Sequence, residues 1–122
     1  FISEPVLVGF KSGIALVITI GTWGLLRDSV DLSLHAVPRH IDPSAVEAYL
    51  ASLPGVLAVH DLHISAMSTT EVALTVHLVK PDAVVDDALL AQIGGDLAAR
   101  FGIGHATVQL ELGSAEHPCR LT

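Results

Sequence analysis

The chain is 122 residues long, which is enough for one domain with a modest hydrophobic core and a short additional segment. Acidic residues outnumber basic residues by 13 to 6, for a formal net charge of −7, and only 4% of residues are aromatic. This balance argues against nucleic acid as a partner, because phosphate binding needs a basic surface and bases stack on aromatic side chains. The single cysteine, Cys119, excludes an intrachain disulfide and fits a reducing compartment.

The first predicted element is a membrane-spanning helix over residues 5–26. This segment carries one charge, Lys11, and is the most apolar part of a chain whose mean hydropathy is +0.61. A helix of this length spans roughly 33 Å, enough for the hydrocarbon core of a bilayer. Trp23 suits an interfacial anchor and Arg27 a positive flank. The alternative interpretation is a buried helix of a soluble protein.

A connector over residues 29–41 and a first amphipathic helix follow. Asp42 is a favourable N-cap, and Pro43 occupies the first helical position, where proline is tolerated. Apolar residues then recur at helical spacing until Pro54-Gly55. The pattern predicts a helix over 43–53.

Three strands and a second helix are predicted beyond this point. Alternating apolar and polar residues indicate the strands, a turn at Ser68-Thr69-Thr70 joins the first two, and helical spacing indicates the helix. Gly94 and Gly95 weaken that helix by roughly 1 kcal/mol each relative to alanine. The predicted elements are strands over 56–66 and 71–79, a helix over 86–101, a strand over 105–112 and a polar tail over 113–122.

The element order α-β-β-α-β indicates an α+β domain with a ferredoxin-like sheet that lacks its first strand. The hairpin makes the first two strands antiparallel. A right-handed crossover through the second helix makes the second and third strands parallel and adjacent. We therefore expect a three-stranded mixed sheet with both helices on one face, preceded by a single transmembrane helix. The other face is left for a partner subunit.

Imidazoles and carboxylates on the predicted strands are the candidate metal ligands, since neutral histidine nitrogen and carboxylate oxygen suit zinc and its first-row neighbours. Successive side chains of a strand point to opposite faces. In a regular first strand, Asp61 and His63 therefore share one face and His60 lies on the other, unless a β-bulge intervenes. The residues predicted to face the core are Val72, Leu74, Val76 and Leu78 of the second strand and Ala106, Val108, Leu110 and Leu112 of the third.

The face without helices can thus gather His77, Glu111 and either His60 or the pair Asp61 and His63. Zinc takes three or four such ligands at about 2.0–2.2 Å. No pair has zinc-finger spacing, so spacing alone does not identify the site. The weaker candidate ligands are Asp61, His63, His105, His117 and Cys119. The chain has no nucleophile elbow, phosphate-binding glycine loop or paired catalytic carboxylates, and we expect no enzymatic activity.

Several stretches occur together in order along residues 5–120. They are Leu53-Pro54-Gly55-Val56, Val59-His60-Asp61-Leu62-His63-Ile64, Ala73-Leu74-Thr75-Val76-His77-Leu78-Val79, Ile103-Gly104-His105-Ala106-Thr107-Val108-Gln109-Leu110-Glu111 and Cys119. As a set they resemble the cation diffusion facilitator family of metal-ion transporters, and more narrowly its bacterial zinc, cobalt and cadmium efflux branch. The stretch Leu25-Leu26-Arg27-Asp28-Ser29-Val30 resembles the end of the sixth transmembrane helix of that family.

The resemblance implies a homodimer that exports divalent cations from the cytoplasm in exchange for protons. It implies a ferredoxin-like cytoplasmic domain that binds zinc near the dimer interface, with His60, His77 and Glu111 as ligands. Gln109 stands where some members have a histidine ligand, and no histidine matches another ligand carried early in the second helix. Ser65 replaces an aromatic residue. The family's transport site, built from Asp and His residues of other membrane helices, is not part of this chain.

The leading hypothesis is therefore the C-terminal part of a divalent-cation efflux transporter, and the absence of an initiator Met leads us to expect a longer protein. We predict a last transmembrane helix within 1–28, the connector over 29–41, a cytoplasmic metal-binding and dimerisation domain over 42–112 and the tail over 113–122, anchored in the inner (plasma) membrane. Zn²⁺, Cd²⁺ and Co²⁺ all accept such ligands. Two alternatives stay open: a soluble regulatory domain that binds a small metabolite, and a purely structural dimerisation module.

Overall fold

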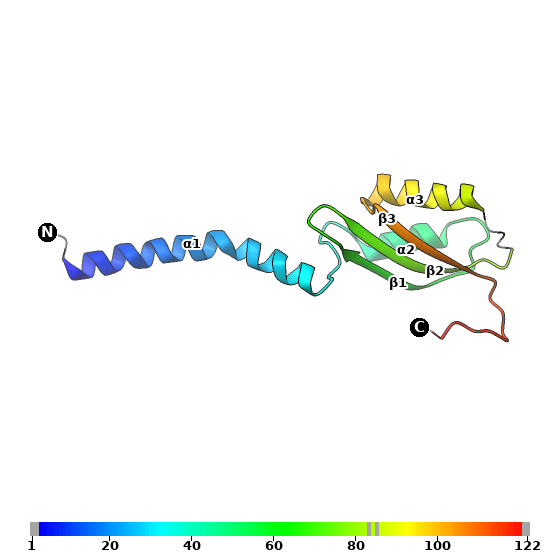
Figure 1. The fold of residues 1–122 in the computed structure, drawn as a ribbon, viewed down its shortest axis with the longest axis horizontal. Coiled ribbons are helices and arrows are strands. Elements are labelled where there is room, and N and C mark those ends of the chain that lie inside the picture. Colours follow the sequence, from blue (N-terminus) through cyan, green and yellow to red (C-terminus); the bar gives the residue numbers. More distant parts are fainter. Residues whose placement is uncertain (1–2, 83, 85, 121–122) are drawn as a thin grey trace. The chain divides into compact units, whose positions relative to one another are not determined.

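The structure, a computed structural model, describes residues 3–82, 84 and 86–120. The chain divides into two compact units, Phe1–Leu34 and His35–Thr122. The first unit consists of one helix, α1 (Glu4–Ser33), and the second contains two helices and a three-stranded sheet (Figure 1). The predicted domain boundaries at 28, 41 and 112 stay predictions.

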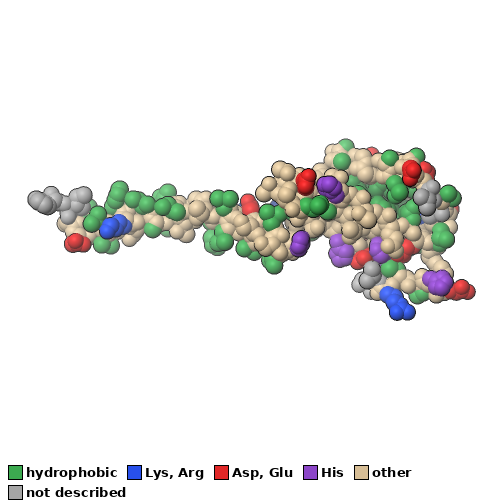
Figure 2. Space-filling model, viewed as in Figure 1, with side chains coloured by type: hydrophobic (Ala, Val, Ile, Leu, Met, Phe, Trp, Pro, Cys, Tyr) green, Lys and Arg blue, Asp and Glu red, His purple; other side chains and the backbone are tan. Residues whose placement is uncertain are grey.

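Helix α1 exposes hydrophobic side chains along its length (Figure 2) and buries none. An 18-residue window within it has a mean hydropathy of 1.7, so the helix is long and apolar enough to cross a membrane. The hydroxyls of Thr19, Thr22, Ser29 and Ser33 each donate to the carbonyl oxygen four residues earlier, at 2.8 Å. These polar groups are thus satisfied within the helix and need no water. The helix ends at Ser33, seven residues beyond the end of the predicted membrane-spanning helix over 5–26.

Aspartate side chains begin both helices of the second unit. Helix α2 (Pro43–Ala51) has Asp42 as its N-cap, and helix α3 (Asp87–Phe101) has Asp86. Each carboxylate accepts a hydrogen bond from the backbone N–H two residues later, at 3.0 and 2.9 Å respectively. These bonds satisfy N–H groups that have no partner inside the helix. Gly102, with φ +71°, ends α3 in the left-handed conformation that glycine adopts without strain.

The three strands form one mixed sheet in the order β1-β2-β3. Strand β1 (Ala58–Ala66) pairs antiparallel with β2 (Val72–Val79), and β3 (His105–Glu111) pairs parallel with β2 after the crossover through α3. This topology confirms the predicted α+β class and the predicted strand neighbours.

The core lies between the sheet and the two helices, which cover the same face (Figure 1). The four β2 residues predicted to face the core are 0–5% exposed. The prediction for Leu112 is wrong, because this residue is 61% exposed. In register, Glu111 pairs with Val79, the last residue of β2, so the chain leaves the sheet before Leu112. The core residues are Ile41, Val46, Tyr49, Leu50, Leu53, Ile64, Val72, Leu74, Val76, Leu78, Ile93, Leu97 and Ile103.

Strand β1 departs from regular alternation at one point. His60 pairs with His77 and His63 pairs with Thr75, so three residues of β1 advance the register by two residues of β2. Asp61, inside this β-bulge, has a φ of +52°. Since His77 and Thr75 share the face of the sheet opposite the core, the bulge brings both His60 and His63 to that face. The regular-strand prediction, which separated them, is corrected.

Candidate metal centre

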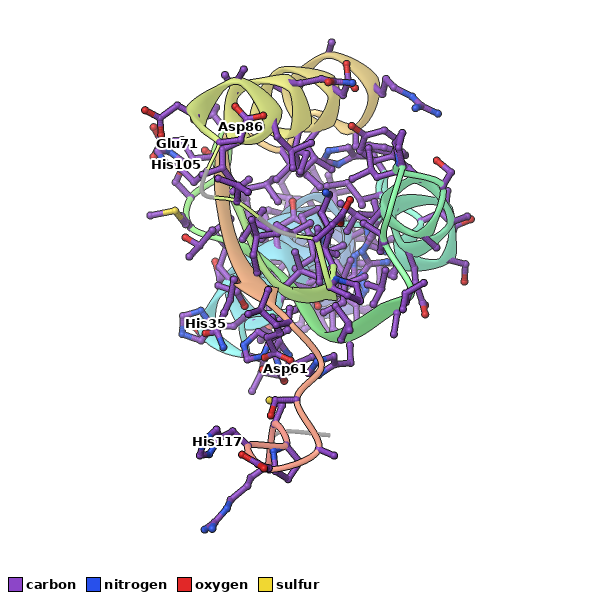
Figure 3. All side chains as sticks on the ribbon, turned by 90° about the vertical axis from the view of Figure 1, so that its right-hand side faces the viewer. His35, Asp61, Glu71, Asp86, His105 and His117 are labelled. Atoms are coloured by element: carbon purple, nitrogen blue, oxygen red, sulfur yellow. The ribbon has the colours of Figure 1, made fainter. Side chains whose placement is uncertain are left out.

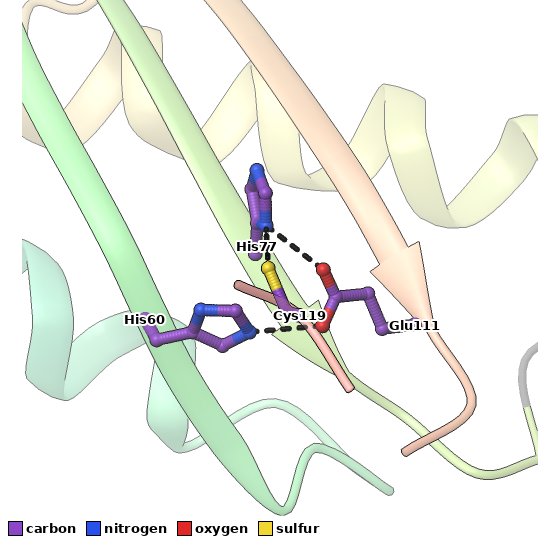
Figure 4. A group of neighbouring side chains, drawn as sticks. All are labelled: His60, His77, Glu111 and Cys119. Carbon is purple, nitrogen blue, oxygen red and sulfur yellow. Dashed lines mark hydrogen bonds and ion pairs between the residues drawn. The ribbon is translucent and has the colours of Figure 1, made fainter. Parts of the chain in front are cut away.

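Four side chains with metal-binding atoms converge on the face of the sheet opposite the helices (Figure 4). They are His60 of β1, His77 of β2, Glu111 of β3 and Cys119 of the C-terminal tail. One ligand atom from each residue lies within 4.8 Å of the ligand atoms of the other three. The strand register brings the first three residues together. His60 pairs with His77 across β1 and β2, and Glu111 lies two residues beyond Gln109, which pairs with His77 across β2 and β3.

Glu111 links the two histidines of this candidate metal centre. Its Oε2 is 2.9 Å from Nε2 of His60, and its Oε1 is 2.8 Å from Nδ1 of His77. The Sγ atom of Cys119 is 3.4 Å from the same Nδ1. The two imidazole rings meet edge to face, with centroids 5.1 Å apart. Gln109 supports the carboxylate, since its Nε2 donates to Glu111 Oε1 at 3.1 Å.

The donor set and its spacing suit a tetrahedral metal ion. Zinc binds nitrogen and carboxylate oxygen at about 2.0–2.2 Å and thiolate at about 2.3 Å, which sets neighbouring ligand atoms about 3.4–3.7 Å apart. Three contacts in the group, from 2.8 to 3.4 Å, are at or slightly below this spacing, and the four donor atoms all lie within 4.8 Å of one another. Small adjustments of the side chains would therefore bring the four donors to tetrahedral spacing around an ion. Two imidazoles, a carboxylate and a thiolate suit Zn²⁺, Cd²⁺ or Co²⁺ better than Mg²⁺ or Ca²⁺, which prefer oxygen ligands alone.

The candidate metal centre is partly shielded from solvent. The side chains of His60, Glu111 and His77 are 24%, 16% and 12% exposed. Burial raises the pKa of Glu111, but hydrogen bonds from His60, Cys119 and His77 and the charge of His60 outweigh burial, so this pKa lies below the usual value. The carboxyl group is thus held in its ionised form, which is the form that binds a metal.

Asp61 and His63 lie beside the candidate metal centre but do not belong to the group of four. Oδ2 of Asp61 is 3.5 Å from Nε2 of His77, on the side of the ring away from Glu111. Its other oxygen, Oδ1, is 2.7 Å from Nε2 of His63. The His63 side chain is 71% exposed. The sequence left open whether His60 or the pair Asp61 and His63 joins His77 and Glu111. In the structure, His60 joins them.

The other two weaker candidates lie elsewhere. His105 begins β3, and its Nε2 is 3.9 Å from Oε1 of Glu71, at the opposite end of the strand from Glu111 (Figure 3). His117 lines the hollow between the tail and the sheet, but it contributes no atom to the group of four.

Cys119 is the member of the centre that the sequence pattern indicated least. It lies outside the strands, and strand alternation says nothing about where a tail returns. The sequence pointed to Cys119 through its place among the stretches that resemble the cation diffusion facilitator family.

Comparisons with known proteins agree with the fold. Residues 38–112 match the family described as "Cation efflux protein, cytoplasmic domain". The "Metal cation efflux system protein CzcD" of Cupriavidus metallidurans is 40% identical over 96 residues, which cover 78% of this chain and 30% of that protein. The "Probable proton-coupled zinc antiporter SLC30A3" of Rattus norvegicus is 33% identical over 110 residues, covering 90% of this chain and 28% of that protein.

A solved structure is similar as well. It is described as the metal-bound C-terminal domain of the CzcD transporter, and it matches with a TM-score of 0.53 and 40% identity, covering 59% of this chain and 100% of that domain. The chain spans less than a third of the length of these curated relatives. The family match covers more than half of the chain and contains all three strands. The chain therefore belongs to the cation efflux protein family and contains the cytoplasmic domain of that family.

Proposed function

We propose that this chain is the C-terminal portion of a divalent metal cation efflux transporter, in which the second unit senses cytoplasmic metal and mediates dimerisation. One observation carries the proposal: donor atoms from three strands and the tail lie within 4.8 Å of one another. They do so in a domain of the cation efflux family, and one relative of known structure is described as metal-bound.

In this proposal the part of α1 up to residue 28 is the last transmembrane segment and lies in the inner (plasma) membrane, while the end of α1, up to Ser33, belongs to the connector. The hydropathy of α1 and the internal hydrogen bonds of its hydroxyl groups support this location. The polypeptide from about residue 29 onward is then cytoplasmic, with the connector over 29–41, the metal-binding domain over 42–112 and the tail over 113–122. Transport itself, as cation/proton antiport, belongs to the complete protein.

The proposed ligands of the ion are His60, His77, Glu111 and Cys119. The imidazoles supply neutral nitrogen, Glu111 supplies an ionised oxygen and Cys119 supplies a thiolate. The thiolate is the donor that most favours Zn²⁺ or Cd²⁺ over hard cations. A bound ion would hold the tail against the sheet, because Cys119 is the only one of the four ligands that lies outside the strands.

The proposed dimer forms on the face of the sheet that carries the metal centre, because α2 and α3 cover the other face. Each chain carries a formal net charge of −7, so two copies repel each other. A divalent ion near their contact reduces this repulsion. The ion then favours the paired state to the extent that it binds that state more tightly than the separate chains.

Equilibrium dialysis of the full chain in detergent micelles against Zn²⁺ tests the proposal. We expect about one tightly bound ion per chain, and loss of that ion when His60 and His77 are both replaced by alanine. Absence of tight zinc binding by the unaltered chain would contradict the proposal and favour the metabolite-binding alternative. A dimer with no bound zinc, unaffected by chelator, would favour the structural dimerisation module.

A further inference from the structure

Asp61 has an unusual backbone conformation beside the metal centre. Its φ of +52° lies in the left-handed region, and among the described non-glycine residues only His35 shares a positive φ. Aspartate and asparagine tolerate this region better than other side chains, but it remains less favourable than an extended conformation. A β-bulge next to a functional site commonly redirects a side chain. The contacts of the Asp61 carboxylate therefore indicate what the bulge is for.

Asp61 lies on the face of the sheet opposite the helices (Figure 3). Its carboxylate contacts two histidines, His63 and His77. Oδ1 is 2.7 Å from Nε2 of His63, and Oδ2 is 3.5 Å from Nε2 of His77. The Asp61 side chain is 20% exposed, whereas that of His63 is 71% exposed. His63 is thus the outer contact, which holds one oxygen of Asp61 while the other oxygen faces His77.

The two ring nitrogens of His77 face different groups. Nδ1 faces Glu111 Oε1 at 2.8 Å and Cys119 Sγ at 3.4 Å, inside the metal centre. Nε2 faces only the Asp61 carboxylate among the contacts described above. A histidine that binds a metal through Nδ1 must carry its proton on Nε2. A carboxylate at Nε2 fixes this tautomer and the orientation of the ring.

We propose that Asp61 is a positioning residue of the metal centre, which accepts the Nε2–H of His77 and so directs the Nδ1 lone pair toward the ion. The inference rests on the proposed function, because it requires a metal at this site. The 3.5 Å separation needs a closure of a few tenths of an ångström to become a hydrogen bond. Rotation of the His77 ring as Nδ1 moves to the ion provides such a closure.

The Asp61→Asn substitution tests this inference, with Glu71→Gln as the matched control. Asparagine has the shape of aspartate and tolerates the same φ, so the bulge is retained while the charge is removed. Glu71→Gln also removes one carboxylate near a histidine of the same sheet, His105, at a distance from the metal centre. Relative to this control, we expect the Kd of the full chain for Zn²⁺ in micelles to rise about tenfold or more.

A second readout separates positioning from a structural role. In the zinc-loaded chain, NMR should detect the Nε2–H proton of His77 as a slowly exchanging imidazole proton, and Asp61→Gly, which removes the acceptor, should lose this resonance. Asp61→Gly, in which glycine adopts φ +52° without strain, should fold at least as stably without metal and yet show the same rise in Kd.

The possible outcomes distinguish this inference from the proposed function. A rise in Kd of less than about tenfold over Glu71→Gln, while the unaltered chain binds zinc, would overturn the positioning role and leave the metal site intact. Retention of the His77 Nε2–H resonance in Asp61→Gly would overturn it too. If the unaltered chain binds no zinc, the proposed function fails, and the role of Asp61 fails with it.

Discussion

At the scale of single residues, His77 is where the parts of the candidate metal centre meet. Nδ1 faces Glu111 and Cys119 and Nε2 faces Asp61, while the core lies on the other face of β2. We expect His77→Ala to weaken zinc binding by more than about 100-fold, since even supporting residues contribute 10–100-fold. The free energy of unfolding without metal should change by no more than about 1 kcal/mol. Zinc titration calorimetry and urea unfolding measure the two quantities.

The matched control for this substitution is His105→Ala. His105 lies on the same sheet beside a carboxylate, Glu71, at 3.9 Å, outside the metal centre. Both zinc affinity and stability should stay close to those of the unaltered chain. Loss of folding in His77→Ala with zinc affinity preserved would identify His77 as a structural residue.

Cys119 offers a spectroscopic prediction. When Co²⁺ replaces Zn²⁺, a bound thiolate gives a sulfur-to-cobalt charge-transfer absorption in the near ultraviolet, which nitrogen and oxygen ligands do not give. We expect this absorption in the unaltered chain and its loss in Cys119→Ser. His117→Ala is the control within the same tail, because His117 supplies no atom to the group of four. A cobalt complex of the unaltered chain without the absorption would remove Cys119 from the ligands.

The residue pattern brought His77 and Glu111 together and left open whether His60 or the pair Asp61 and His63 joins them, and this ambiguity at His60 has a physical cause. Parity along β1 assumes one residue of β1 for each residue of β2, and the bulge at Asp61 breaks this rule. No glycine marks the bulge in the sequence, and the tolerance of aspartate for positive φ is the single local signal. The position of Cys119 depends on long-range contacts of the tail, on which local sequence patterns carry no information.

At the scale of elements, the contact between α2 and α3 includes the hydroxyl of Tyr49, which donates to Asp96 Oδ2 at 2.7 Å. Burial of Tyr49 and the neighbouring Asp96 carboxylate raise the pKa of the tyrosine to about 12. A raised folded-state pKa contributes stability that is fully present below the unfolded value of about 10 and is lost as the pH rises toward 12. The second unit should therefore lose stability across this alkaline range.

Tyr49→Phe isolates this contribution. The variant should be about 1 kcal/mol less stable at pH 7, because it lacks the hydrogen bond. Its free energy of unfolding should also fall less steeply than that of the unaltered chain between about pH 10 and 12. Urea unfolding across this range measures both slopes, and the difference removes the contribution of the lysines. Parallel slopes would show that Tyr49 titrates alike in the folded and unfolded states.

The end of α3 provides a second prediction at this scale. Gly102 has φ +71°, and a Cβ there would meet only His40 Nε2, at the ordinary contact distance of 3.9 Å. Gly102→Ala should thus lower the free energy of unfolding by about 1–2 kcal/mol through backbone conformation alone. Gly104→Ala is the control, because a Cβ there meets nothing within 4 Å and its φ is not in the left-handed region. Equal effects in urea unfolding would contradict the conformational explanation.

The elements themselves were predictable where local chemistry defines them. The Asp42 and Asp86 caps and Gly102 mark the helix ends, and their signals lie within a few residues of each boundary. Strand order followed from chain connectivity, because a hairpin and a right-handed crossover leave few alternatives. The end of β3 was less predictable, since it depends on where the neighbouring strand β2 ends at Val79.

At the scale of the whole molecule, metal binding should stabilise the second unit specifically. The four candidate donors come from three strands and the tail, and the fold of the second unit brings them together. A ligand that binds only the folded form raises the free energy of unfolding by about 2.7 kcal/mol when its concentration is 100 times Kd. We expect Zn²⁺ to have this effect on the full chain in micelles, and EDTA to reverse it.

Each unit contains one residue whose signal can follow its unfolding. The unit that zinc stabilises can therefore be identified. Tyr49, the only tyrosine, is buried in the second unit, and Trp23, the only tryptophan, lies in α1. In urea, zinc should shift the transition seen through Tyr49. The Trp23 signal should show no transition, because a helix embedded in a micelle keeps its hydrogen bonds. If zinc leaves the Tyr49 transition unchanged while His60, His77, Glu111 and Cys119 are intact, the four donors do not act together as a metal centre.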